Sequence, residues 1–388
     1  MLTCTWAPTV FEGMQLAFSG ARSGARAADA PAALSRAAPR GAALRGFLAD
    51  YVQRLEGWGV SHLLVAQRWW GSGQEMEGSS HDCLAMTALI AGLSDRIELV
   101  TAIHPGFMQP TAVAKWGATI DAISDGRWSI NVTSGWNMAE FEMYGIDPLP
   151  HDERYARASE FIEVLRGAWA TPGFDHAGRY YQARGLRLEP RPGRPLTVFQ
   201  GGQSPAAVAM AARHADWMFL NGGDPASVAA TIARVREACA ATGRQVRFAL
   251  YANPLVRESD AAAWAEIDRR VAMLDPERVA QRRALLARGK AGSGLAEGAR
   301  AGGMWTSEDA LAMLDTNEGF ASRLIGAPDT VLRRIEAFHA LGVDMLHLTL
   351  ADAAFIEHVL PHVHGIGESR TQTPAPTQTG AKTGGEQP

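Results

Sequence analysis

The chain has 388 residues, of which 47% are hydrophobic and 20% charged, and its net charge is −4. These values are typical of a globular protein with a large core, and they give no reason to expect nucleic acid or an anionic membrane as partner. No apolar run approaches the roughly 18 residues that span a bilayer. The N-terminus lacks a secretory pattern, and the three cysteines are too widely spaced for a disulfide framework. We therefore expect a cytoplasmic protein.

Short apolar runs that alternate with helical patterns predict the strands. In chain order they are Leu2–Trp6, Leu63–Val65, Ile97–Ile103, Trp128–Val132, Leu196–Phe199, Trp217–Leu220, Val246–Leu250 and Met345–Leu350. The runs are continuous rather than alternating, as in parallel strands covered on both faces. Pro110, Pro205 and Pro328 mark the first turns of intervening helices. Eight strand–helix repeats predict an α/β fold, a (β/α)8 TIM barrel with insertions, with a doubly wound sheet as the alternative.

We predict a single barrel domain over residues 1–365. Three segments of the chain do not follow the alternation of strands and helices. Residues 19–46 are rich in Arg and Ala, which resembles a transit peptide, but they follow the first strand and favour an inserted surface loop. Residues 270–325 are long and Gly-rich, and we interpret them as a lid. The polar tail at 366–388 is predicted to be disordered.

Common catalytic motifs are missing from the sequence. It contains no G-x-S-x-G, no H-E-x-x-H, no P-loop and no paired C-x-x-C. No glycine fingerprint of a dinucleotide site follows a predicted strand. These absences weigh against the common hydrolases, zinc enzymes and dehydrogenases.

A candidate phosphate site follows the fifth predicted strand. Gly201 and Gly202 lead to Ser204, which can cap a helix, and then to Pro205 in the first turn. Free N–H groups at such a helix start attract a phosphate. The alternative is an ordinary capped turn, because barrel phosphate sites are typically found after the seventh and eighth strands.

Arg154 opens a second predicted helix, where a positive charge opposes the helix dipole. A nearby anion would offset this cost, so Arg154, Tyr155 and Ser204 together could hold one phosphate. The alternative is an ion pair between Arg154 and one of the nearby carboxylates, Asp152, Glu153 or Glu140.

Two histidines are placed where they could reach a ligand. His104 follows the third predicted strand, and a neutral imidazole there can donate a hydrogen bond to a substrate or flavin oxygen; the alternative is a packing role. His81 precedes the second helix and either caps it or lines a pocket. We predict no metal site, because the adjacent residues His151, Asp152 and Glu153 would seldom converge on one ion.

Several motifs occur in the order found in one enzyme family. They are Ile130–Trp136, Ala139–Phe141, His151–Tyr155, Phe199–Ser204, Ala215–Trp217 and Asn317–Pro328. In these motifs the chain resembles the luciferase-like, reduced-flavin-dependent monooxygenases, over roughly Val60 to His364. Its closest resemblance is to the dimethyl sulfone monooxygenases, with alkanesulfonate monooxygenase and the pyrimidine oxygenase as neighbours.

The resemblance implies a barrel that binds FMNH2 supplied by a separate NAD(P)H-dependent flavin reductase. Oxygen, as co-substrate, would form a peroxyflavin that attacks the substrate while the lid excludes water. Such enzymes tend to form homodimers or homotetramers. By position in the motifs, the implied FMN contacts are Ala66, Gln67, Asn131, Glu140, Arg154, Tyr155 and Ser204.

Departures from the alkanesulfonate branch bear on the substrate. That branch resembles this chain along Arg247–Asn253, but it has an arginine where Tyr251 stands and a histidine where Asn253 stands. It also has a lid arginine near the position of Asn317. Burying a sulfonate without a cationic partner would cost several kcal/mol. The resemblance therefore favours a neutral organosulfur substrate such as dimethyl sulfone, although Arg323 in the lid could compensate.

The predicted reaction is oxidative C–S cleavage, with His81, His104 and Asn253 as hydrogen-bond donors or proton carriers in the pocket. Alternatives are an alkanesulfonate substrate, or ring opening or dehalogenation of another small molecule. A deazaflavin-dependent oxidoreductase and a non-enzymatic flavin-binding protein are further possibilities.

Overall fold

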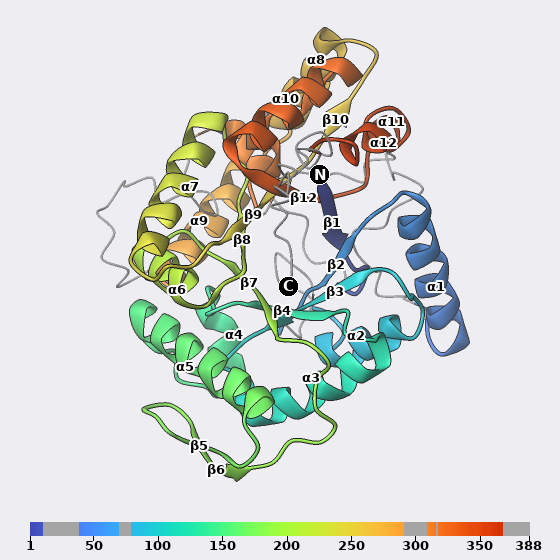
Figure 1. The fold of residues 1–388 in the computed structure, drawn as a ribbon. Helices are drawn as coiled ribbons and strands as arrows, with labels where there is room; N and C mark the ends of the chain where they lie inside the picture. Colours follow the sequence, from blue (N-terminus) through green and yellow to red (C-terminus); the bar gives the residue numbers. More distant parts are fainter. Residues whose placement is uncertain (11–38, 70–78, 291–308, 316, 368–388) are drawn as a thin grey trace, which may run out of the picture.

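The computed structural model describes residues 1–10, 39–69, 79–290, 309–315 and 317–367. Eight parallel strands close into a barrel in the order β1-β12-β9-β8-β7-β4-β3-β2 (Figure 1). They are β1 (Leu2–Trp6), β2 (His62–Val65), β3 (Glu98–Ile103), β4 (Trp128–Val132), β7 (Thr197–Gly201), β8 (Trp217–Leu220), β9 (Arg247–Ala252) and β12 (Val343–Leu348). Each overlaps one predicted apolar run, so the predicted TIM barrel is confirmed.

Helices surround the barrel and cover the outer face of the strands (Figure 1). They are α1 (Ala42–Gly57), α2 (Cys83–Ala91), α3 (Pro110–Ser124), α5 (His151–Ala170), α6 (Pro205–His214), α7 (Pro225–Ala240), α10 (Pro328–Leu341), α11 (Ala353–His358) and α12 (Leu360–Val363). Proline in the first turn begins α3, α6, α7 and α10, since its missing N–H costs nothing there. Asp82, Ser204 and Asp224 cap α2, α6 and α7 through their side chains.

The core has two layers, separated by the barrel wall. Inside the barrel, Leu64, Phe199 and Met345 belong to one buried cluster. Outside it, a larger cluster joins the outward side chains of the strands to the apolar faces of the helices. The strands are buried on both faces, so their sequences are mostly apolar, with polar residues such as Thr3 of β1, Asn131 of β4 and His347 of β12 among them. This apolar content explains why the strands could be predicted from their composition.

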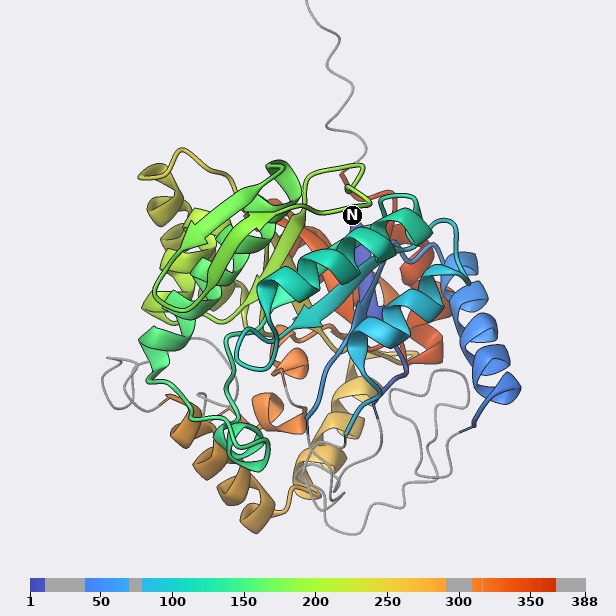
Figure 2. The ribbon, with the colours of Figure 1, turned by 90° about the horizontal axis from the view of Figure 1, so that it is seen from below.

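Additional elements lie at both ends of the barrel. At one end, β5 (Phe174–Ala177) and β6 (Gln182–Leu186) form an antiparallel hairpin that the sequence analysis did not predict. At the other lie α4 (Met138–Met143), α8 (Asp260–Ala272), α9 (Pro276–Lys290) and a short pair, β10 (Leu255–Val256) with β11 (Ile325–Gly326). The 3-10 turns η1 (Ala310–Leu314) and η2 (Gly319–Ser322) complete this end. Figure 2 shows the hairpin and α9 on opposite sides of the barrel.

The predicted insertions are only partly within the described residues. Helix α1 begins at Ala42, inside the range predicted for the first insertion, and residues 11–38 lie outside the described part. The predicted lid contains α9, η1 and η2. Its residues 291–308 and 316 lie outside the described part of the chain. The predicted disordered tail also lies outside, from residue 368 onward.

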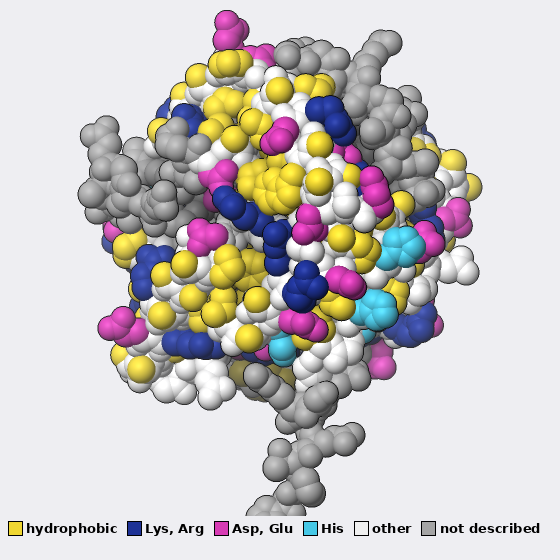
Figure 3. Space-filling view, turned by 90° about the horizontal axis from the view of Figure 1, so that it is seen from above, with side chains coloured by type: hydrophobic (Ala, Val, Ile, Leu, Met, Phe, Trp, Pro, Cys, Tyr) yellow, Lys and Arg dark blue, Asp and Glu magenta, His cyan; other side chains and the backbone are white. Residues whose placement is uncertain are grey.

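Charges of both signs are interspersed on the face that carries α8 and α10 (Figure 3). Glu266 of α8 accepts hydrogen bonds from the guanidinium groups of Arg257 and Arg270. Within the described residues, no helix is both long enough and apolar enough to cross a bilayer.

Candidate active site

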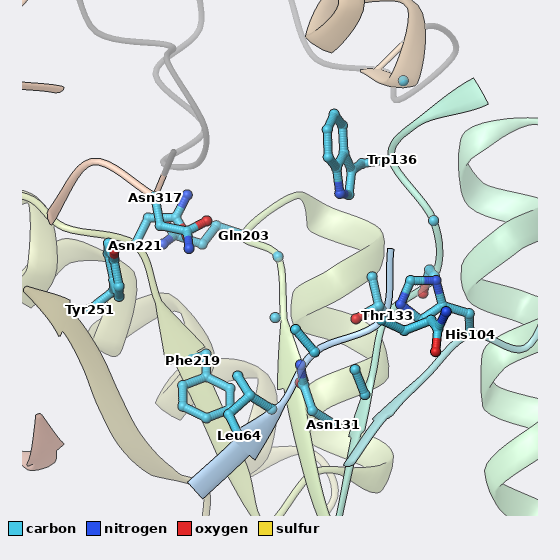
Figure 4. A pocket seen from close by; sticks show the side chains of 18 of the residues that line it. Leu64, His104, Asn131, Thr133, Trp136, Gln203, Phe219, Asn221, Tyr251 and Asn317 are labelled. Atoms are coloured by element: carbon cyan, nitrogen blue, oxygen red, sulfur yellow. The ribbon is translucent and has the colours of Figure 1, made fainter. Parts of the chain in front are cut away.

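A pocket opens at the carboxyl ends of the barrel strands, the end at which barrel enzymes place their active sites. Its lining comes from all eight strands or from the residues that follow them. In Figure 4, Tyr251, Asn221 and Asn317 lie on one side, His104 and Thr133 lie on the other, and Trp136 lies above them. The fold therefore brings together residues from nearly the whole length of the sequence.

Most of the predicted site residues line this pocket. They are Ala66, Gln67, His104, Asn131, Arg154, Tyr155 and Ser204. The other three, His81, Glu140 and Asn253, are not among the described lining residues.

Tyr155 and Ser204 meet at one end of the pocket, as the sequence analysis expected. Ser204 accepts a hydrogen bond from the backbone N–H of Ala207 at 3.2 Å, and its hydroxyl also hydrogen-bonds the phenol of Tyr155. Gly202 between the two has φ +100°, and a Cβ there would lie 2.7 Å from the Tyr155 hydroxyl. Glycine at this position therefore leaves room for the phenol beside the start of α6.

Arg154 lies at the same end, with only 3% of its surface exposed. Its guanidinium donates to the carbonyl oxygens of Leu149 at 2.7 Å and Gly289 at 2.5 Å. Its Nε is buried and makes no hydrogen bond with any of the described residues, and burial lowers the pKa of the group. The structure thus shows carbonyl partners for Arg154 rather than the ion pair considered as the alternative.

The three candidate carboxylates have other neighbours. Asp152 lies 2.6 Å from Nδ1 of His151, and Glu153 pairs with Arg179 at 2.7 Å. Glu140 accepts the backbone N–H of Trp69 at 3.0 Å. Among the described residues, none of the side chains that line the pocket is a carboxylate. A cation and two hydroxyls without an opposing negative charge fit a phosphate.

Several uncharged polar atoms of the pocket have no hydrogen-bond partner among the described residues. They are Oδ1 of Asn131, Oγ of Ser134 and Nε2 of His347, and all three are buried. Buried polar atoms are nearly always hydrogen-bonded in folded proteins. Their position on the pocket wall indicates that a polar ligand is their partner.

An aromatic wall lines the side of the pocket near β1, β8, β9 and β12. The ring of His347 lies 4.4 Å from Trp6, 5.0 Å from Phe219 and 5.3 Å from Tyr251, measured between centroids. Burial lowers the pKa of His347 to about 3, so the imidazole is neutral near pH 7. This wall was not predicted from the sequence, although aromatic residues near the carboxyl ends of predicted strands were a usable signal.

Part of the predicted lid contributes directly to the pocket. Leu286 and Gly289 of α9 line it, and the carbonyl oxygen of Gly289 reaches Arg154. A Cβ on Gly289 would lie 1.9 Å from the carbonyl oxygen of Trp136. Only glycine permits this approach of α9 to the loop after β4.

Three predicted residues lie elsewhere. Glu140 of α4 accepts the backbone N–H of Trp69 and is not among the described lining residues, and its flavin contact stays a prediction. Asn253 hydrogen-bonds the buried carboxylate of Asp315, which in turn accepts backbone N–H groups of the turn at Asn317–Phe320. His81 precedes α2, whose cap is Asp82. These positions follow from local hydrogen bonds that sequence order does not reveal.

Known proteins are similar to this chain in both sequence and fold. The family model described as luciferase-like monooxygenase matches residues 28–345. FMNH2-dependent dimethylsulfone monooxygenase of Pseudomonas fluorescens (strain Pf0-1) is 34% identical over 310 residues, 78% of this chain and 82% of the relative. The enzyme of the same description from Pseudomonas putida is 34% identical over 299 residues, 75% of this chain and 81% of the relative.

Solved structures agree with the barrel fold. The crystal structure of a long-chain alkane monooxygenase has a TM-score of 0.70 at 19% identity, covering 94% of this chain and 91% of that chain. A riboflavin lyase has a TM-score of 0.69 at 19% identity, with 94% and 92% covered. The predicted family and enzyme class are confirmed, and the chain belongs to the luciferase-like monooxygenases.

Proposed function

We propose that this chain is a two-component FMNH2-dependent monooxygenase that cleaves a C–S bond of a small neutral sulfone such as dimethyl sulfone. The observation that carries the proposal is the distribution of charge in the pocket. Its described cationic lining is confined to Arg68 and Arg154, and the wall formed by Trp6, Phe219 and Tyr251 is uncharged. The names of the two bacterial relatives support both the cofactor and the substrate class.

FMN fits the residues that line the pocket. Arg154, Tyr155 and Ser204 would hold its phosphate, because they offer a buried guanidinium and two hydroxyls without a carboxylate. Ala66, Gln67 and Asn131 would border its ring system, and Oδ1 of Asn131 lacks a partner within the described chain. Reduced FMN supplies the electrons that activate O2, and the surrounding residues bind it, orient it and exclude water.

The described environment of Tyr251 favours a neutral substrate. Burial raises the pKa of the Tyr251 phenol, which donates or accepts a hydrogen bond with Thr349 at 3.1 Å. Arg323, the residue that could have compensated for a missing sulfonate-binding arginine, lies 3.6 Å from Asp309 and does not line the pocket. A sulfonate next to Tyr251 would therefore lose its hydration without gaining a cationic partner from the described residues.

Reduced flavin must reach this pocket from outside. A separate NAD(P)H-dependent flavin reductase is therefore part of the proposal, as is a homodimeric or homotetrameric assembly in the cytoplasm. For dimethyl sulfone, the balanced reaction consumes the sulfone, FMNH2 and O2. It yields methanesulfinate, formaldehyde, FMN and water.

The test combines purified protein with a flavin reductase, NADH, FMN, O2 and dimethyl sulfone, and measures methanesulfinate and formaldehyde. Parallel reactions contain an alkanesulfonate or a nitrogen heterocycle, and an anaerobic reaction contains reduced deazaflavin. We expect product from the sulfone in the aerobic reaction. Turnover of another class without sulfone oxidation would refute the substrate assignment, and anaerobic turnover with deazaflavin would refute the cofactor.

A further inference from the structure

Trp69, in the loop after β2, contacts His104, which lines the pocket, and is not itself among the described lining residues. Its indole Nε1 lies 3.0 Å from Nδ1 of the imidazole. The indole stacks on Phe107, with centroids 4.4 Å apart and planes 8° apart, and Tyr144 packs against its edge at 5.3 Å. Its backbone N–H donates to Oε1 of Glu140 at 3.0 Å. Trp69 is therefore held through both its ring and its backbone.

The direction of the hydrogen bond between Trp69 and His104 follows from chemistry alone. An indole N–H can only donate, so Nδ1 of His104 must accept and cannot carry a proton. Burial and the charge of Arg68 lower the pKa of His104 to about 3, so the ring is neutral near pH 7. A neutral imidazole carries one N–H, which must then be on Nε2.

The Nε2 atom of His104 is available to a ligand. No described residue forms a hydrogen bond with Nε2. The atom is also not one of the fully buried polar atoms that lack a partner, so it retains some exposed surface. His104 lines the pocket, where Figure 4 shows it beside Thr133 and below Trp136.

We propose that Trp69 is a positioning residue that fixes His104 as the Nε2–H tautomer, so that the pocket receives a hydrogen-bond donor and not a proton acceptor. Glu140 takes part by holding the backbone of Trp69, which gives this buried carboxylate a role outside the flavin site. The ligand that receives the hydrogen bond offers an acceptor atom. Under the proposed function, this atom is a flavin carbonyl oxygen or ring nitrogen, or a sulfonyl oxygen.

The tautomer can be measured without any ligand or turnover. Nitrogen-15 NMR of protein labelled at histidine distinguishes a protonated Nε2 from a protonated Nδ1. We expect a single Nε2–H form for His104 in the unaltered protein, and a mixture in Trp69→Phe, which keeps an aromatic ring against Phe107 but lacks the N–H. Phe107→Leu is the matched control, because it disturbs the same stack while leaving the indole donor in place. It should retain the single tautomer.

Two results would overturn the proposal. One is a protonated Nδ1, or a mixture, in the unaltered protein. The other is an unchanged single tautomer in Trp69→Phe. The first result is independent of whether the variant folds, so the proposal stays testable in either case.

The receiving atom is identified with a second pair of variants. His104→Gln keeps an amide N–H near the position of Nε2, whereas His104→Ala removes it. Loss of one neutral hydrogen bond should weaken binding about tenfold in the alanine variant, with most of the effect restored by glutamine. Weaker FMN binding would identify the flavin, and a raised KM for the sulfone alone would identify the substrate. No change in either quantity would contradict the donor role.

This design separates the inference from the proposed function. If no sulfone is oxidised, the proposed function fails, but the NMR result and the FMN titration still decide the tautomer and its role.

Discussion

Polar side chains at the two ends of the barrel differ in their hydrogen-bond partners. At the amino ends of the strands, the carboxylate of Asp216 accepts hydrogen bonds from Arg166, Arg244 and the backbone N–H of Val198. At the carboxyl ends, buried polar atoms of the pocket have no partner in the described chain. The first arrangement stabilises the fold, whereas the second leaves hydrogen-bonding capacity for a ligand. Isolated buried atoms without a partner among the described residues also occur away from the pocket, such as Oγ1 of Thr3 and Nε of Arg244, so the binding end is marked by several such atoms on one pocket wall.

The largest effect is expected for Arg154→Ala, which removes the buried cation from the proposed phosphate site. A charge-assisted hydrogen bond contributes about 3 kcal/mol, so the affinity for FMN should fall roughly 100-fold. Fluorescence titration of FMN measures this loss. Arg179→Ala is the control, because Arg179 is an exposed arginine whose partner is Glu153. Equal FMN affinities in the two variants would contradict the assignment of Arg154.

Because His347 of the aromatic wall is neutral in the folded protein, we expect the protein to lose stability in acid. The folded-state pKa of His347 is about 3, below the unfolded value of 6.5, so the unfolded chain binds an additional proton between these values. Its contribution to stability is therefore present above pH 6.5 and is lost as the pH falls toward 3, by about 1.4 kcal/mol per pH unit.

His347→Phe should reduce that slope, since phenylalanine does not titrate and can pack against Trp6 and Phe219. Denaturant unfolding at several pH values below 6.5 measures the slope. Tyr251, the titratable neighbour on the same wall, has a raised pKa and stays neutral in this range. An identical pH dependence in the variant and the unaltered protein would show that His347 is not a buried neutral group.

The comparison between the two ends of the barrel is tested most sharply by making the same substitution, serine to alanine, at each end. Ser94, before β3, donates to Glu56 at 2.6 Å and accepts from the backbone N–H groups of Arg96 and Ile97. Ser134, after β4, has a buried hydroxyl without a hydrogen-bond partner in the described part of the chain. Ser94→Ala should lower the free energy of unfolding by about 1–2 kcal/mol, and Ser134→Ala by less than about 0.5 kcal/mol.

For the affinity for FMN, we expect the opposite result, with the larger effect in Ser134→Ala. Ser134→Ala removes a hydroxyl from the pocket and should weaken the binding of FMN several-fold, whereas Ser94→Ala should not. Thermal unfolding with and without FMN measures both properties in one experiment. Equal destabilisation by the two substitutions would remove the distinction between the ends.

The barrel could be predicted from the sequence because its strands are buried on both faces, so each one contains a short run that is mostly apolar. The β5–β6 hairpin could not, since its strands are short and partly exposed. That Arg154, Tyr155 and Ser204 line one pocket was also predictable, because all three lie at helix starts and in the family motifs. Their contact with a phosphate stays a prediction.

Contacts between residues far apart in sequence were not predictable. Trp69 meets His104 across 35 positions and Glu140 across 71, and neither distance is encoded in local periodicity. For the same reason, the hydrogen bond between Glu140 and the backbone of Trp69 could not be predicted from the place of Glu140 in a motif. The aromatic wall around His347 depends on the closure of β1 against β12, which brings together the two ends of the barrel sequence.

The central claim is that the pocket holds FMN with its phosphate between α5 and α6. A crystal structure of the complex with FMN tests it most directly. We predict the phosphate within hydrogen-bond distance of Arg154, Tyr155 and Ser204, with the ring system extending toward Asn131 and His104. A phosphate bound elsewhere, for example in the neighbouring cavity lined by Asp224 and Arg234 of α7, would contradict this account.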